Sequence, residues 1–306
     1  MLAEPASQRP TIGLALGGGA ARGFAHIGVI RTLIAHGFTP EIVAGTSIGA
    51  VIGGCYAAGK LDQVDEWGKT LTRRRILSYL DVSFAGSGLI SGGRLAEKLT
   101  EALGDLTIES LPMRYAAIAT EIGTGHEMWI TRGSLVEAMR ASYALPGVFP
   151  PVSINGRWLM DGALVNPLPI SVARALGARV VIAVNVNADN FGRGTAVPDI
   201  GASSNPIAEV AAKTIFGGDE KTAKRRFLGT AARPGISTVM VEAFNVMQDR
   251  ITRARLAGDP PDVLISPKLG GVGVFEFNRA QDAIALGAEA TERAMEGIKE
   301  AVATLV

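Results

Sequence analysis

The N-terminal part of the chain alternates between short apolar runs and stretches in which apolar side chains recur at helical spacing. Residues 11–16 form an apolar run that stops at three consecutive glycines, which predicts a buried strand followed by a tight turn. Residues 21–36 have the spacing of an amphipathic helix, and the glycine that follows suits its C-terminal cap. Residues 41–44 predict a second short strand, and residues 48–58 predict a second helix. Two consecutive strand–turn–helix units therefore open the chain.

The rest of the chain continues with further strands and helices and with one segment that shows no periodicity. Residues 61–111 have mainly helical spacing and are more polar than the first units. Further strands are predicted at residues 113–122, 126–131, 152–160, 180–186 and 263–266. Further helices are predicted at residues 134–144, from 167 onward, within 206–257 with a break near 234–235, and from 278 onward. Residues 187–205 predict a mobile loop, and residues 1–10 predict a flexible end.

Alternating strands and helices are typical of an α/β fold built on a parallel sheet. We therefore expect a three-layer α/β/α sandwich with a mostly parallel central sheet. One local exception is the Asn155-Gly156 pair, a strong turn signal that predicts a hairpin within residues 152–160. No internal repeat or linker divides the sequence, so residues 1–306 are expected to form a single domain.

Composition narrows the class of protein. The chain has 306 residues, of which 47% are hydrophobic, and this apolar content excludes global disorder. The formal net charge of +1 does not give the chain the overall positive charge expected of a nucleic-acid-binding protein. The N-terminus has no basic segment followed by an apolar core, and no apolar run reaches the ~18–20 residues of a membrane span. We expect a cytoplasmic protein, peripheral at most to a membrane, whose single cysteine, Cys55, is a buried apolar side chain.

The segment Gly45-Thr46-Ser47-Ile48-Gly49 lies between a predicted strand and a predicted helix. The pattern Gly-x-Ser-x-Gly in that position is typical of a nucleophile elbow, a sharp turn that exposes a reactive serine. Such a turn needs small neighbours, and the helix N-terminus beside it favours developing negative charge. The same pattern can occur by chance in a chain with 38 glycines, but the flanking strand and helix favour Ser47 as a nucleophile.

Residues 17–23, Gly-Gly-Gly-Ala-Ala-Arg-Gly, follow the first predicted strand and open the first predicted helix. A dinucleotide- or phosphate-binding loop is a poor match, because the glycine spacing is interrupted and the phosphate-binding lysine is missing. An oxyanion hole beside the elbow fits better, because a glycine turn can present backbone N–H groups to a developing negative charge. Its candidate donors are the N–H groups of Gly18, Gly19, Ala20 and Ile48. Arg22 would either brace this loop or meet an anionic group.

A serine nucleophile needs a proton acceptor, and the chain has only three histidines. The usual Ser-His-Asp chain orders cannot be built around Ser47, except one that uses His126 with an acidic residue before it. A carboxylate could instead act as the base, and Asp161, where a predicted strand ends in Asp161-Gly162, is the best placed. From the dipeptide alone, an ordinary Asp-Gly turn is the simpler interpretation. Both kinds of base stay open at this point.

Taken together, these segments resemble the patatin-like phospholipase family, especially its bacterial branch related to the catalytic domain of neuropathy target esterase. The matching segments are residues 17–23, 25–29, 45–50, 140–151, 161–163 and 259–265. They span nearly the whole chain and follow the family's order. One minor departure is Ala163, which stands where many relatives have glycine.

The resemblance implies a Ser–Asp dyad formed by Ser47 and Asp161, with the glycine loop as its oxyanion hole. It also implies a three-layer α/β/α sandwich related to the α/β hydrolases, and hydrolysis of carboxylic esters of phospholipids, lysophospholipids or acylglycerols. A lipid ester is then the expected partner, without nucleic acid, and no metal or cofactor is required. Three rival functions stay open: a lipid acyltransferase with the same dyad, a catalytically silent adaptor and a nucleotide-binding protein.

Smaller signals receive structural interpretations. We expect His26 to be a core residue on the first helix, His36 to be solvated and Ser142 to be structural. Residues 73–75, three arginines, are expected to be solvated charge beside a helix, although they could touch anionic lipid heads. The glycines between residues 86 and 93 predict a hinge for a lid over the site.

Overall fold

The computed structural model describes residues 9–72, 93–189 and 236–305. Within these ranges, eight strands form one sheet in the order β5-β6-β3-β2-β1-β7-β8, and β4 pairs with β3 outside this path. The strands are β1 Ile12–Leu16, β2 Ile42–Thr46, β3 Arg114–Glu121, β4 Glu127–Ile130, β5 Val152–Ile154, β6 Arg157–Asp161, β7 Val180–Val184 and β8 Val263–Ile265.

The sheet has a parallel part and an antiparallel end. Strand β1 pairs in parallel with β2 and β7, and the parallel pairing continues from β2 to β3 and from β7 to β8. Strands β4 and β6 both pair antiparallel with β3, and β5 pairs antiparallel with β6. The predicted β5–β6 hairpin is confirmed, since Asn155 and Gly156 both have positive φ, as a two-residue hairpin turn requires.

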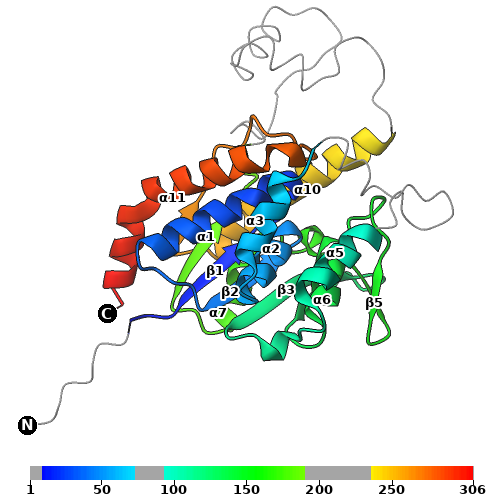
Figure 1. Ribbon diagram of the computed structural model, residues 1–306, viewed down its shortest axis with the longest axis horizontal. Helices are drawn as coiled ribbons and strands as arrows, with labels where there is room; N and C mark the ends of the chain where they lie inside the picture. The colour runs from blue at the N-terminus through cyan, green and yellow to red at the C-terminus, as the bar shows by residue number, and fades with distance from the viewer. Residues whose placement is uncertain (1–8, 73–92, 190–235, 306) are drawn as a thin grey trace, which may run out of the picture.

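Helices cover both faces of the sheet, so the predicted three-layer α/β/α sandwich is confirmed. The α-helices are α1 Ala25–Ala35, α2 Ile48–Ala57, α3 Leu61–Lys69, α5 Gly93–Leu103, α6 Leu135–Tyr143, α7 Ile170–Ala175, α10 Ile236–Gly258 and α11 Ala280–Ala303. Short 3-10 segments are η1 Ala20–Phe24, η2 Ile108–Ser110, η3 Gly162–Leu164 and η4 Phe277–Arg279. Figure 1 shows α11 lying alongside α1, with α2 and α3 next to them.

The two faces of the sheet carry side chains of different size, because neighbouring positions of a strand point to opposite faces. Leu14 and Leu16 of β1 lie in the larger core, which is built with α1, α2, α6 and α11. Ala15, Ala44 and Ala116, from three neighbouring strands, lie in the smaller core under α7 and the C-terminal part of α10. Small side chains on this second face let the short helix α7 pack close to the sheet.

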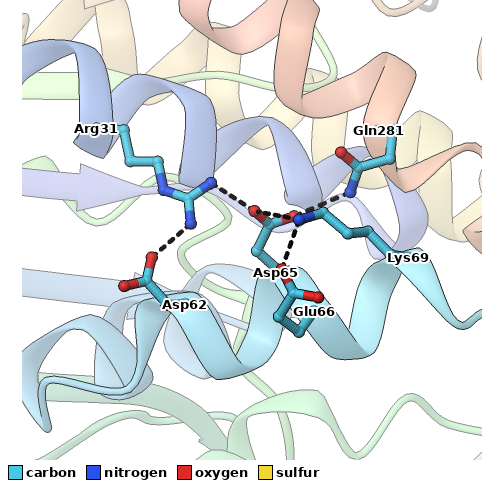
Figure 2. A network of polar contacts seen from close by, with 6 residues as sticks. All are labelled: Arg31, Asp62, Asp65, Glu66, Lys69 and Gln281. Atoms are coloured by element: carbon cyan, nitrogen blue, oxygen red, sulfur yellow. Dashed lines mark hydrogen bonds and ion pairs between the residues drawn. The ribbon is translucent and has the colours of Figure 1, made fainter.

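A polar network joins the helices that cover the larger core (Figure 2). The carboxylate of Asp65 on α3 accepts hydrogen bonds from Arg31 of α1 and Gln281 of α11, and Lys69 lies 3.6 Å away. Burial of Asp65 acts to raise its pKa, but these hydrogen bonds and charges outweigh burial and hold the pKa below its usual value. The buried carboxylate is therefore ionised and ties α3 to α1 and α11.

Several predicted boundaries differ from the structure. The first predicted helix begins as the 3-10 segment η1, and β2 continues to Thr46, two residues beyond the predicted end. The long predicted helical region between residues 61 and 111 contains α3, α5 and η2. Several predicted features lie outside the described residues: residues 1–8 of the flexible end, the three arginines at 73–75, and the break near residues 234–235. The same holds for most of the 86–93 hinge and most of the 187–205 loop. In the described ranges, no helix is long and apolar enough to cross a bilayer.

Candidate active site

Ser47 lies at a sharp turn between β2 and α2, with φ of 56° and ψ of −123°. Residues other than glycine rarely adopt this backbone conformation, so the backbone at Ser47 is strained. The neighbouring glycines are needed for space, since a Cβ on Gly45 would lie 2.4 Å from the carbonyl oxygen of Gly49. A Cβ on Gly49 would lie 2.2 Å from the carbonyl oxygen of Leu16. The strand, turn and helix expected of a nucleophile elbow are all present.

Sheet register brings Ser47 and Asp161 to the two sides of β3. Thr46, the last residue of β2, pairs with Ile118 of β3. The next residue of β3, Ala119, pairs with Asp161 at the end of the antiparallel strand β6. The serine and the aspartate therefore meet beside β3, at the ends of β2 and β6, although 114 positions separate them in the sequence.

Two hydrogen bonds hold Ser47. Its hydroxyl donates to Oδ2 of Asp161 at 2.7 Å, and its backbone N–H donates to the hydroxyl oxygen of Ser142 at 2.8 Å. The hydroxyl of Ser142, on α6, donates in turn to the carbonyl oxygen of Ile118 at 2.6 Å. Ser142 is fully buried and has the structural role expected of it, but the structure adds that it holds the backbone of the elbow serine.

The carboxyl group of Asp161 is fixed by its surroundings. Its Oδ1 accepts the backbone N–H of Ala163 at 2.8 Å, which leaves Oδ2 for Ser47. Its own N–H donates to the carbonyl oxygen of Ala144, and its carbonyl oxygen accepts the hydroxyl of Thr120. Since both oxygens and both backbone groups have partners, the orientation of this carboxyl group is determined by the fold.

Burial controls the charge of Asp161, which is 2% exposed. Loss of water raises its pKa from the usual 3.8 to about 7, although the hydrogen bonds from Ala163 and Ser47 act in the opposite direction. A carboxylate with a pKa near neutrality can take a proton from a hydroxyl and later return it. Asp161 therefore has the charge properties of a general base.

The glycine loop presents unbonded N–H groups beside the elbow. The N–H groups of Gly19, Ala20 and Ile48 have no hydrogen-bond acceptor among the residues that the structure describes. The N–H of Gly18, in contrast, donates to the carbonyl oxygen of Pro167 at 3.1 Å. The expectation that Gly18 is an oxyanion donor is corrected here, because its N–H is already used to attach the loop to the segment before α7.

Arg22 braces the glycine loop. Its Nε donates to the carbonyl oxygen of Val272 at 2.7 Å, and its Nη1 lies 3.4 Å from Oδ1 of Asn187. The side-chain amide of Asn187 donates to the carbonyl oxygen of Gly18 at 2.8 Å. Of the two roles left open for Arg22, bracing is the one that these contacts support. The part played by Asn187 was missed, because it follows β7 without any recognisable motif.

All three histidines are described, and none contacts Ser47 or Asp161. His26 is fully buried and its Nε2 lies 2.8 Å from the carbonyl oxygen of Gly17, so the ring supports the glycine loop. Burial lowers the pKa of His26 to about 4, although the contact with Gly17 opposes this, so the ring is neutral at pH 7. His36 contacts Glu292 on α11, and His126, in the β3–β4 turn, lies 3.8 Å from Glu121. The triad through His126 is therefore not assembled.

One further polar side chain lies at the site without a sequence signal. Gln248 of α10 is 5% exposed, and its Oε1 has no hydrogen-bond partner in the described structure. It lies next to Gly18 of the glycine loop only because α10, far along the chain, packs near that loop. No group of three or more His, Cys, Asp or Glu side chains that could hold a metal ion occurs in the described ranges.

Fold and site together define a class of protein. An elbow serine on an α/β/α sandwich, bonded to a buried carboxyl group and flanked by unbonded N–H groups, is the arrangement of a serine hydrolase. The family model of the patatin-like phospholipases matches residues 14–174, more than half of the chain. The chain belongs to the patatin-like phospholipase family, and it is a carboxylic ester hydrolase of the phospholipase and lipid esterase class.

Relatives found by sequence agree with this assignment. An uncharacterized NTE family protein of Mycobacterium tuberculosis is 34% identical over 336 residues, covering 96% of this chain and 93% of the relative. A lysophospholipase of Yarrowia lipolytica is 39% identical over 180 residues, covering 57% of this chain but 12% of that much longer protein. Among solved structures, VipD from Legionella pneumophila has a TM-score of 0.45 and 16% identity, with 95% of this chain and 67% of VipD covered. The resemblance to the branch related to neuropathy target esterase is confirmed.

Proposed function

We propose that this chain hydrolyses carboxylic ester bonds of lipids with Ser47 as nucleophile and Asp161 as base. The observation that carries the proposal is the 2.7 Å hydrogen bond from Ser47 Oγ to Asp161 Oδ2. It is made at a strained turn, by a carboxyl group whose pKa, about 7, suits proton transfer at neutral pH. The three histidines are elsewhere engaged, which supports a dyad over a triad.

Acylation begins when the Ser47 hydroxyl attacks the ester carbonyl. Its proton passes to Oδ2 of Asp161 as the new C–O bond forms. The tetrahedral intermediate then collapses, the bond to the leaving alcohol breaks, and Asp161 gives the proton to the alcohol oxygen. Water then attacks the acyl-enzyme and gives one proton to Asp161. When the bond from the acyl carbon to Ser47 Oγ breaks, Asp161 returns that proton to Oγ, and the fatty acid is released.

The oxyanion of each tetrahedral intermediate would be bound by backbone N–H groups. Those of Gly19, Ala20 and Ile48 support this role, because they have no acceptor in the described structure. Ile48 is the first residue of α2, whose positive dipole end adds to the stabilisation. One such donor is worth about 2.7–4 kcal/mol of transition-state stabilisation in enzymes of this kind. Gly18 would contribute its small size instead of its N–H.

A cavity of about 290 Å³ between α2, α3 and α5 supports a lipid substrate. Val51 and Cys55 line it from α2, four residues apart and therefore on one face of the helix whose N-cap is Ser47. Trp67 and Leu95 add apolar walls from α3 and α5. We assign this cavity to the acyl chain of the substrate. The lysophospholipase of Yarrowia lipolytica supports a monoacyl phospholipid as one candidate, presented at a membrane surface that the enzyme would contact peripherally.

The direct test of the proposal is covalent labelling of the serine. A fluorophosphonate should label the parent protein at Ser47, and Ser47→Ala should abolish both labelling and ester hydrolysis. Ser153→Ala, which removes an exposed serine of β5, is the matched control and should label like the parent. Labelling that persists in Ser47→Ala, or a parent protein that neither labels nor hydrolyses esters, would overturn the dyad and leave the adaptor or nucleotide-binding function to be considered.

A further inference from the structure

Residues 161–167, which we call the base segment, connect the three parts of the proposed catalytic site. The first residue of the segment is the proposed base. The carbonyl oxygen of Asn166 accepts the hydroxyl of Thr46, the residue before the nucleophile, at 2.7 Å. The carbonyl oxygen of Pro167 accepts the N–H of Gly18, in the glycine loop, at 3.1 Å. A shift of this one segment would therefore move the base relative to both the serine and the glycine loop.

Two charged side chains from other elements hold the base segment. The Nε of Arg255, on α10, donates to the carbonyl oxygen of Val165 at 3.1 Å, and its Nη2 donates to Oε2 of Glu127, on β4, at 2.8 Å. Oε1 of Glu127 accepts the side-chain amide of Asn166 at 2.7 Å. The guanidinium group thus holds the segment twice, once directly and once through the carboxylate. Two separate nitrogens in a rigid plane make these bonds, which a single ammonium nitrogen does not reproduce.

The side chain of Asn166 indicates that this arrangement serves position more than stability. Asn166 is fully buried, and its Oδ1 has no hydrogen-bond partner among the described residues. The opposite orientation of the amide would place Oδ1 against the carboxylate of Glu127, so the bond to Glu127 leaves this oxygen without a donor. An unpaired buried acceptor destabilises a fold, and the ion pair of Glu127 with Arg255 is too exposed to contribute much stability in return.

We propose that Arg255 and Glu127 are positioning residues, which keep the base segment where proton transfer from Ser47 requires it. The inference rests on the proposed function, because it concerns the geometry of the Ser47–Asp161 pair. Neither residue contacts the reacting atoms, and both act through the base segment. Arg255 lies beyond residues 14–174 that the family model matches, so α10 would contribute to catalysis from outside that region.

The test compares two variants that break this connection with a matched control on the same helix. Arg255→Gln removes the guanidinium group, and Glu127→Gln leaves one oxygen for the three N–H donors that meet its carboxylate. We expect the acylation rate at saturating p-nitrophenyl butanoate to fall about tenfold to 10²-fold in each, because a displacement on the order of 1 Å can have that effect. The half-saturating ester concentration should stay within about threefold. Arg253→Gln, which removes the ion pair of Arg253 with Asp249 on α10, should match the parent.

Fluorophosphonate labelling separates positioning from a loss of folded enzyme. A displaced dyad labels more slowly than the parent but to the same final extent, whereas a poorly folded variant labels to a lower extent at the parent's rate. The double variant of Arg255→Gln with Glu127→Gln should lose less than the product of the two single losses, because both changes release the same segment.

The inference is wrong if both single variants label at the parent's rate per site, or if their losses multiply in the double variant. Should either variant fail to fold, Arg255→Lys keeps the charge but not the two separate nitrogen donors. It should label at least about threefold more slowly per site than the parent, and a rate equal to that of the parent would overturn the inference. A parent protein that does not label at all would instead count against the proposed function itself.

Discussion

At the scale of single residues, burial moves the pKa values of Asp161 and His26 in opposite directions. It raises the pKa of the carboxyl group to about 7 and lowers that of the imidazole to about 4, since in each case the charged form loses its hydration. At neutral pH His26 is therefore a neutral support for the carbonyl oxygen of Gly17, whereas Asp161 changes its charge in the range where an enzyme works. The same burial gives the two groups different roles, because a carboxyl group is charged when deprotonated and an imidazole is charged when protonated.

The pH dependence of activity should follow Asp161. The base must be deprotonated, so kcat/KM should rise with pH through about 7, reach a plateau above it, and fall about tenfold per pH unit below it. An enzyme whose base is a carboxylate of ordinary pKa would stay active well below pH 6.5, the usual pKa of histidine. Because burial raises the pKa of Asp161 to about 7, the pH profile alone does not distinguish this base from a histidine. The profile should be the same in a double variant with His36→Gln and His126→Gln. A midpoint that shifts in that variant, or its loss of activity while folded, would return His126 to consideration.

Replacing the carboxyl group should separate activity from stability. Asp161→Asn keeps the shape but removes the base, so acylation should fall by about 10²–10⁴-fold. The folded-state pKa lies above the unfolded value, so the parent loses stability as pH rises from about 4 to about 7, and the variant does not. At pH 8 the variant should be more stable than the parent, by up to about 4 kcal/mol for a shift of about three units. Urea unfolding at pH 4 and pH 8 checks this, and a difference that is equal at both pH values would contradict it.

Sequence reasoning reached these residues by different routes. Ser47 could be predicted from a local pattern, because the elbow needs small residues at fixed offsets and leaves that requirement in the sequence. Asp161 could be predicted as the base only through the family resemblance, because Asp-Gly by itself is a common turn. The position of Gln248 beside Gly18 could not be predicted, because it depends on the return of α10 to the glycine loop. Long-range contacts of this kind leave no periodic signal.

At the scale of elements, the site depends on the close packing of the β2–α2 turn against α6 and β3. The end of β2 was predicted too early because Gly45 is a poor strand former, yet its lack of a side chain is what lets strand and helix meet. The hairpin that carries Asp161 was predicted, since Asn155-Gly156 determines its turn. The antiparallel pairing of β6 with β3 was not predicted, because the alternation of strands and helices indicates only the parallel part.

Ser142 connects these elements, so its removal should disturb the nucleophile. Ser142→Ala leaves the backbone N–H of Ser47 and the carbonyl oxygen of Ile118 without their partner. We expect the free energy of unfolding to fall by about 1–3 kcal/mol and kcat to fall by up to about 10²-fold, because the serine is no longer held in position. Urea unfolding and ester hydrolysis measure the two effects, with Ser153→Ala as control. Parent-like values of both would show that the elbow holds Ser47 without help from α6.

At the scale of the whole molecule, the two parts of the sheet carry different residues of the proposed mechanism. The parallel part supplies Ser47, the glycine loop and the N-terminus of α2, and the antiparallel end supplies Asp161. Helices α2, α3 and α5 enclose the apolar cavity on the larger-core face, and the network of Asp65 in Figure 2 fixes α3 against its neighbours. The cavity and Ser47 thus share α2, and in the proposed function this arrangement would let the enzyme select the length of the acyl chain.

Acyl-chain selection is the prediction that tests this arrangement. If the cavity holds the chain, kcat/KM of the parent should rise from p-nitrophenyl butanoate to decanoate, by about 0.8 kcal/mol for each methylene that becomes buried. Ala102 lines the cavity from α5, so Ala102→Phe should reduce its volume and abolish the gain for the longer esters while leaving butanoate nearly unchanged. Thr100→Phe adds the same ring at an exposed position of the same helix and serves as the control. Parent rates that do not depend on chain length, or a uniform loss across all esters in Ala102→Phe, would mean that the acyl chain binds elsewhere.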